Sequence, residues 1–365
     1  RVEGNGDANL LFVDASTDRI GIGTSAPAHD LDVLTTSSST SKSMRLGATA
    51  SSGANNSTMI ISNGGTGDAM LRFDYEGSNT DRARIGVTSS GQQLEFYTAG
   101  DNERFRIASD GSLSTITAGT SNVRFGATAG NSIASGAQYN TLIGDNAGTA
   151  ITTGDRNVAV GFGALQSEDA NGYNVAVGYA ALDALNAGAD AYNVAVGYAA
   201  GNNLTTGIRN TLIGGLAGDA LTDADDNVAI GQQSLSSDTL GSGAVAIGHN
   251  ALFTQNFTTA TTNYNVAIGY KAGEAVTTGL YNTLIGGLAG DALTDADHNV
   301  AIGFNALSSD TLGSASIGIG KGALNGQNFT TATTAYNVAV GHSAGTSVTT
   351  GVRNNLFGGL AGDAL

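Results

Sequence analysis

The chain has no cysteine and a single proline, and each scarcity excludes a class of protein. Without cysteine there are no disulfides and no thiolate metal sites. Pro27 is the only proline, and the 54 glycines follow no Gly-X-Y period, so the chain is not collagen. No apolar run approaches the roughly 18–20 residues that cross a bilayer, so we expect no membrane insertion. The first residues also lack the pattern of a signal peptide.

Basic residues are scarce too, with 15 Lys and Arg against 31 Asp and Glu, for a formal net charge of −16. An acidic surface repels phosphate backbones, so we expect no nucleic-acid partner. Charged residues make up only 13% of the chain and hydrophobic residues 41%, which argues against charge-driven disorder. The abundant glycine favours close-packed β-structure with many tight turns.

A five-residue phrase, Asn-(Val/Thr)-(Ala/Leu)-(Val/Ile)-Gly, recurs through the second two-thirds of the chain. Most steps between copies are about 17 residues long, and from Gly197 four steps form a 72-residue superperiod. A fixed short period of this kind indicates a solenoid, in which each repeat packs only against its neighbours. The copies end on Gly144, Gly161, Gly178, Gly197, Gly214, Gly231, Gly269, Gly286, Gly303 and Gly341, with looser copies ending on Gly248, Gly320 and Gly358.

A repeat of about 17 residues suffices for two short strands and two turns, which predicts one coil of a parallel β-roll per repeat. We expect Val175 and Val177 to point into the coil, Ala176 to point outward, and the Ala-Ala-Leu stretch after Gly178 to form a second strand. The repeated asparagines, such as Asn174, would stack at one corner. Thirteen coils at about 4.8 Å each would build roughly 60 Å.

Small outward residues would leave a flat, weakly apolar stripe, and packing of identical chains about an axis would bury it. The fold prediction is therefore an all-β, elongated homotrimer built from a parallel β-solenoid of about 17-residue coils. The stripe would consist of Ala159, Ala176, Ala195, Ala229, Ala267, Ala301 and Ala339.

Two longer steps, of about 21 residues each, insert the segments 254–262 and 326–334, which have room only at a turn. We expect Phe257 and Phe329 to fold back over the coil and the threonines to stay exposed. At the other end, residues 122–126 form a degenerate copy in which Arg124 and Phe125 suit a first, capping coil.

Before the repeats, short apolar runs and period-two alternation predict short strands. We expect residues 1–36 to form a β-hairpin and connector, 37–43 a Ser/Thr-rich linker, 44–115 a small antiparallel β module, and 116–365 the solenoid repeats. The chain opens at Arg1 without Met, and residues 358–365 match 286–293, where the earlier copy continues. We therefore expect an internal piece of a longer polypeptide that stops inside a repeat.

The repeats over residues 122–365 resemble the head repeats of trimeric autotransporter adhesins, which are parallel β-rolls packed as trimers. This chain departs from that pattern in its period, because those heads commonly use shorter steps. Two phrases at the front resemble bacteriophage tail-fibre and virion-fibre proteins: residues 21–27 with Leu31-Asp32-Val33 after them, and residues 103–111. Such proteins are usually trimeric, and some carry adhesin-like repeats.

Candidate chemistry is sparse. Gly21-Ile22-Gly23 lacks the third glycine and the helix of a dinucleotide site, and the glycines of 214–220 lack the lysine of a phosphate loop. His298 replaces Asp226, and His249 aligns with Lys321, which indicates exposed, tolerant positions for these histidines rather than a catalytic set. The remaining histidines are His29 and His342.

Two further sets have simpler explanations than a ligand site. Aspartates at 219–226, and again at 291–297, could bind calcium, but capping of turns explains them better. Tyrosines before the repeated Asn, such as Tyr173, and aromatic residues after the repeated Gly, such as Tyr179, would either bind sugar or stack from coil to coil; stacking is the simpler account. We therefore expect no catalytic, cofactor-binding or metal-binding residue, and no cofactor.

These observations favour a non-enzymatic fibre segment, such as a phage tail-fibre shaft or virion appendage that supports host attachment. One alternative is the head or stalk of a bacterial trimeric surface adhesin. Another is a polysaccharide-cleaving tailspike, which would need carboxylates converging in a groove. The expected partners are two further copies of the chain, other virion or fibre proteins at the ends, and a glycan or protein of a host surface. The expected location is extracellular, on a virion or, in the alternative, on a bacterial cell.

Overall fold

The computed structural model describes residues 2–4, 7–22, 24–27, 31–33, 69–73, 83–87, 93–98, 102–107, 113–115 and 121–364. All regular elements among these residues are strands, so the all-β prediction is confirmed. None of the described residues belongs to a helix long and apolar enough to cross a bilayer. The chain divides into two compact units, Arg1–Ala69 and Met70–Leu365. The predicted linker at 37–43 lies outside the described residues.

The first unit holds a four-stranded sheet in the order β1 (Val2–Gly4), β2 (Asp7–Asp14), β3 (Arg19–Ile22) and β4 (Leu31–Val33). Strands β2 and β3 are antiparallel, so the predicted hairpin is confirmed. The Asp14 carboxylate closes its turn by accepting hydrogen bonds from the hydroxyl of Ser16 at 2.6 Å and that of Thr17 at 2.8 Å. These hydrogen bonds, of which the one from Ser16 has the largest effect, hold the pKa of Asp14 below its ordinary value.

The second unit begins with a five-stranded sheet in the order β5 to β9, antiparallel from β6 onward. The rings of Phe96 and Phe105 face each other across β7 and β8, with their centroids 5.6 Å apart. The period-two pattern therefore does mark strands here. Their bounds are β5 (Ala69–Phe73), β6 (Ala83–Val87), β7 (Leu94–Thr98), β8 (Asn102–Ile107) and β9 (Leu113–Thr115).

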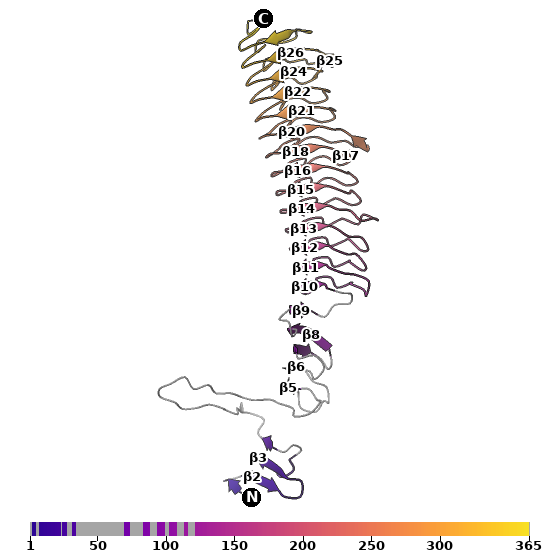
Figure 1. The fold of residues 1–365 in the computed structure, drawn as a ribbon, viewed down its shortest axis with the longest axis vertical. Coiled ribbons are helices and arrows are strands. Elements are labelled where there is room, and N and C mark those ends of the chain that lie inside the picture. Colours follow the sequence, from indigo (N-terminus) through magenta and orange to yellow (C-terminus); the bar gives the residue numbers. More distant parts are fainter. Residues whose placement is uncertain are drawn as a thin grey trace, which may run out of the picture. The chain divides into compact units, whose positions relative to one another are not determined.

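The repeats form a parallel β-solenoid, drawn from magenta to yellow in Figure 1. Each repeat contributes one three-residue strand to a 14-stranded parallel sheet, and every strand pairs in register with the next, as Ala159 does with Ala176. The prediction that each copy of the phrase forms one coil is confirmed. The strands are β10 (Val123–Phe125), β11 (Thr141–Ile143), β12 (Val158–Val160), β13 (Val175–Val177), β14 (Val194–Val196), β15 (Thr211–Ile213), β16 (Val228–Ile230), β18 (Val245–Ile247), β20 (Val266–Ile268), β21 (Thr283–Ile285), β22 (Val300–Ile302), β24 (Ile317–Ile319), β26 (Val338–Val340) and β27 (Asn355–Phe357).

The second strand expected after Gly178 is absent, and that prediction is wrong. The stretch that follows each repeated glycine is a series of turns. Its amides still bond to the next coil, as Leu182 N does to the Ala200 carbonyl at 3.0 Å. Turns therefore stack from coil to coil as well as strands do, because both satisfy their backbone groups with the neighbouring repeat.

The core is narrow, and no coil places a leucine at both of two facing positions. Where the middle residue of the strand is leucine, as at Leu212, the fourth residue after the repeated glycine is Gly218. Where the middle residue is Ala176, that turn position is Leu182, which is fully buried. A Cβ on Gly218 would lie only 2.8 Å from Cδ2 of Leu212, so there is space for one leucine of the two.

The repeated asparagines form the predicted stack at one corner. Asn157, Asn174 and Asn193 are fully buried. Each backbone N–H donates to the side-chain carbonyl of the asparagine one coil earlier, with Asn174 N 3.0 Å from Asn157 Oδ1. The side-chain amides donate across the coil, as Asn193 Nδ2 does to the Gly207 carbonyl at 2.8 Å. This ladder satisfies buried polar groups along the solenoid.

The extra residues of each longer step are held in position by hydrogen bonds to a buried acidic side chain in the preceding coil. Asp238 stands in a core column that elsewhere holds residues such as Leu221, and it is fully buried. Its carboxylate accepts hydrogen bonds from Phe257 N at 3.0 Å and Gln255 Nε2 at 2.6 Å. Asp310 does the same for Phe329 one superperiod later. Glu168 accepts from Ala187 N at 3.3 Å at the 19-residue step.

Phe257 and Phe329 are buried, while Thr258 and Thr259 are exposed, so the predicted arrangement of the longer steps is confirmed. Part of each insertion also forms an additional pair of two-residue parallel strands. These strands are β17 (Gly241–Ser242) with β19 (Thr261–Thr262), and β23 (Gly313–Ser314) with β25 (Thr333–Thr334).

Candidate functional site

The strand face of the solenoid is reversed relative to the sequence prediction. Ala159, Ala176 and the other alanines of the expected outward stripe are fully buried. Val175 and Val177 flank Ala176 on the outward side and are half-buried. The prediction that the valines point into the coil is therefore wrong. The narrow core explains this orientation, because a turn leucine such as Leu182 in this coil fills the space that a larger strand residue would need.

The outward side chains form two rows along the sheet, called here the strand face. One row is the first residue of each strand of the 14-stranded sheet, and the other is the third. No residue of either row is charged, and most are Val or Ile. Val196 is 36% exposed and Phe357, in the last strand, is 68% exposed. A long uncharged face is unusual in a chain with 31 acidic residues.

A corner column, made of the residue directly before each repeated asparagine, lies beside the strand face. Tyr173 and Tyr192 stack with ring centroids 4.8 Å apart, and the Arg156 guanidinium lies 5.3 Å from the Tyr173 ring. Tyr281 stacks on His298 at 4.9 Å. These residues adopt a left-handed backbone conformation that turns the chain into the strand. The predicted coil-to-coil stacking is confirmed.

An edge column, made of the residue directly after each repeated glycine, lies on the other side. Phe162, Tyr179 and Tyr198 stack on three successive coils, with centroids 5.5 and 5.4 Å apart. His249 stacks on Tyr270 at 5.6 Å. The rings are about half exposed, so they bury their faces against one another and leave their edges in water.

Aspartates of the acidic turns bond to neighbouring coils. The carboxylate of Asp225 accepts from Ile208 N at 2.8 Å, and that of Asp297 accepts from Leu280 N at 2.7 Å. Asp219 accepts from the Ser236 hydroxyl at 2.6 Å. Among the described residues no three His, Asp or Glu side chains are grouped so as to hold a metal ion. Asp219, Asp225 and Asp297 therefore link neighbouring coils rather than cap their own turns.

Burial and pairing shift the pKa of some of these acids in opposite directions. Burial raises the pKa of Asp219, and likewise that of Asp291. Asp226 instead forms an ion pair with Arg209 at 2.6 Å, and this hydrogen bond holds its pKa below the ordinary value. Both partners of the pair are about half exposed, so it contributes little to stability.

Glycine amides of the repeated phrases bond to neighbouring coils. In 214–220 the N–H of Gly214 donates to the Val196 carbonyl and that of Gly218 to the Ser234 carbonyl. His249, His298 and His342 are exposed and lie on different coils, as predicted, while His29 lies outside the described residues. These histidines do not come together as a set.

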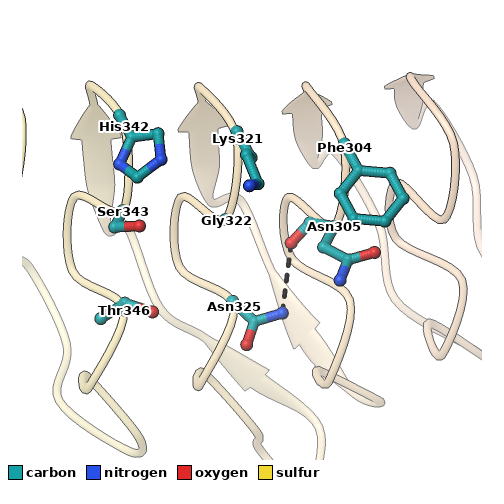
Figure 2. A pocket seen from close by; sticks show the side chains of 8 residues that line it. All are labelled: Phe304, Asn305, Lys321, Gly322, Asn325, His342, Ser343 and Thr346. Atoms are coloured by element: carbon teal, nitrogen blue, oxygen red, sulfur yellow. Dashed lines mark hydrogen bonds between the residues drawn. The ribbon is translucent and has the colours of Figure 1, made fainter.

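The structure brings together a group of residues that the sequence did not single out. Three successive coils border a shallow depression of about 220 Å³. Figure 2 shows Phe304, Lys321 and His342 in one row across these coils, with the turn residues beneath them. The side-chain amide of Asn325 donates to the main-chain carbonyl of Asn305 at 3.3 Å and to the Ser308 hydroxyl at 2.6 Å. These two bonds hold one side of the depression in place. We name this depression the edge pocket; its lining is Phe304, Asn305, Lys321, Gly322, Asn325, His342, Ser343 and Thr346.

Comparison of each residue with the one 72 places earlier singles out the edge pocket. Each of its eight positions differs from the residue 72 places earlier, whereas most of the other positions between 304 and 346 are unchanged. Variation thus concentrates at the pocket. The signal is visible in the sequence only once the structure shows which turn positions share a surface.

Comparison of the chain with protein-family models, with curated proteins and with solved structures gives no match. What this chain does must therefore be argued from its own geometry.

Proposed function

We propose that this chain is a structural, non-enzymatic fibre segment, a tail-fibre or virion-appendage shaft that supports host attachment as a parallel homotrimer. The observation that carries the proposal is the run of 14 in-register coils with an uncharged strand face along its length. Such a column supplies length and stiffness, since every coil bonds to the next through strands, turns and the asparagine ladder.

Copies of the chain would pack on the strand face, and not on the alanine stripe that was expected from the sequence. Its two rows span roughly 10 Å across and 65 Å along the 14 coils, or about 650 Å². Exposed rings of the corner column widen this area toward the roughly 800 Å² that one partner contributes to a standard interface. Two further copies, placed about an axis parallel to the solenoid, would cover the face at equal heights.

Location is the property that tests this function. Antibodies raised against residues 121–364 and coupled to gold should label a lateral appendage of purified virus particles in electron micrographs. Labelling of a bacterial surface in uninfected cells, with unlabelled particles, would contradict the proposal and favour the surface-adhesin alternative.

A further inference from the structure

The edge pocket is an open version of a groove that is filled elsewhere on the same solenoid. One superperiod earlier, its Ser343 and Thr346 correspond to Lys271 and Glu274, which form an ion pair at 3.0 Å. Asn250, which corresponds to Gly322, donates to that glutamate at 3.2 Å. The earlier groove is thus occupied by its own side chains.

Smaller residues open the later copy. Gly322, Ser343 and Thr346 replace asparagine, lysine and glutamate. A Cβ placed on Gly322 would have only the Ser343 hydroxyl within 4 Å, at 3.6 Å, which shows how much space surrounds this position. The depression therefore results from particular substitutions in an otherwise closely copied repeat.

The groups that face the edge pocket combine a ring, a cation and neutral hydrogen-bonding groups. Phe304 is 51% exposed. Lys321 is exposed and, among the described residues, pairs with no carboxylate, unlike Lys271. Ser343 and Thr346 add neutral hydroxyls to the lining. No acidic residue lines the pocket, although acids outnumber bases two to one in the chain.

We propose that the edge pocket binds one carboxylated pyranose unit of an acidic polysaccharide. The C–H face of the sugar would pack on the Phe304 ring, and the sugar carboxylate would meet the Lys321 ammonium. Sugar hydroxyls would bond to the hydroxyls of Ser343 and Thr346. The volume of about 220 Å³ is small for an organic ligand site, which fits one ring of a longer chain.

A nucleotide would use similar groups, because a base stacks on an aromatic ring and a phosphate pairs with lysine. The depression of about 220 Å³ has room for one ring, whereas a nucleotide unit adds a base and a phosphate to its ribose. The size of the pocket therefore favours the sugar acid.

The test is titration of the whole chain with oligogalacturonate, followed by calorimetry and by saturation-transfer NMR. We expect saturating binding that is lost with the methyl-esterified oligomer, which keeps the rings and removes the charge. Lys321→Gln and Phe304→Gln should each weaken binding about tenfold or more, the loss expected for a charged hydrogen bond or a stacked ring. The double variant Ser343→Lys with Thr346→Glu should abolish binding by restoring the ion pair of the earlier groove.

Two controls make the result decisive. The double variant installs residues that already occupy the same coil positions at 271 and 274, so it should fold, and an unchanged circular dichroism melt checks this. Arg353→Gln removes one positive charge outside the pocket and should leave the affinity unchanged. Absence of binding at millimolar oligomer, equal binding of the methyl ester, equal affinity of the pocket variants, or preferential binding of an oligonucleotide would each overturn the proposal.

Discussion

Whether a side chain of this solenoid points into the core or outward depends on the space available to it rather than on its hydrophobicity. The turn position four residues after each repeated glycine is left-handed whether it is Gly218, with φ of 56°, or Leu182, with φ of 51°. A leucine with positive φ is strained, so backbone preference alone would put glycine at every copy. Leucine at this turn position occurs only in coils whose strand has no central leucine, such as that of Ala176, where it fills the core. In the coils of Ala195, Ala267 and Ala339 both positions are small. At Gly201 the space is taken by Leu182 and Leu212 of the adjacent coils.

Threonine substitutions on neighbouring residues test this orientation. Ala176→Thr adds volume and a hydroxyl to the filled core and should cost roughly 2–4 kcal/mol of unfolding free energy. Val177→Thr is nearly isosteric and faces outward, so it should cost less than about 1 kcal/mol. Denaturant unfolding of both variants measures the difference. Equal costs, or a larger cost at Val177, would show that the valine faces the core.

The size balance between strand and turn predicts a rescue. Leu212→Ala should destabilise the coil by about 2–5 kcal/mol because it leaves a cavity. Gly218→Leu alone would collide with Leu212, but in combination with Leu212→Ala it recreates the arrangement of Ala176 and Leu182. We expect the double variant to recover part of the lost stability in a double-mutant cycle. Simple additivity of the two losses would contradict this balance.

At the scale of elements, the sequence predicted spacing well and orientation poorly. The interval between repeated glycines located every solenoid strand, because one copy of the phrase makes one coil. The alternation of Val175, Ala176 and Val177 gave the wrong face, since a three-residue strand cannot show that Leu182 approaches from the opposite turn. The edge pocket was missed for a related reason: Phe304, Lys321 and His342 become neighbours only when coils stack.

Buried acids fasten the longer coils, and one of them makes stability depend on pH. Burial raises the pKa of Glu168, so the folded chain holds that proton more tightly than the unfolded chain. Its favourable contribution is complete below the ordinary glutamate pKa of about 4.3 and is lost as pH rises through the raised folded-state value.

Glu168→Gln removes this ionisation. The fall in unfolding free energy between pH 4 and pH 7 should therefore shrink. Denaturant unfolding across that range measures it, with Asp363→Asn, at an exposed acid of the last coil, as the control. A Glu168→Gln profile parallel to that of the parent would contradict a raised pKa at this position.

At the scale of the whole molecule, the solenoid presents one face without charge and several with acids. Rows of Val and Ile outside a sheet are exposed in a single chain and covered in an assembly. In the proposed trimer, three parallel copies would bring equivalent coils to the same height, so a single change in the repeat would act at one level of the assembly. The edge pocket lies on turns beyond the strand face, so binding of a sugar there and assembly use different residues.

Sedimentation equilibrium of the purified chain tests the assembly most directly. The chain of 36.3 kDa should sediment as a species of about 109 kDa, three times its own mass, at micromolar concentration. Val177→Lys places a charge on the strand face and should shift the mass toward the monomer while the β-sheet circular dichroism persists. A parent chain that remains a 36.3 kDa monomer at these concentrations would contradict the account of the strand face as the surface on which copies pack.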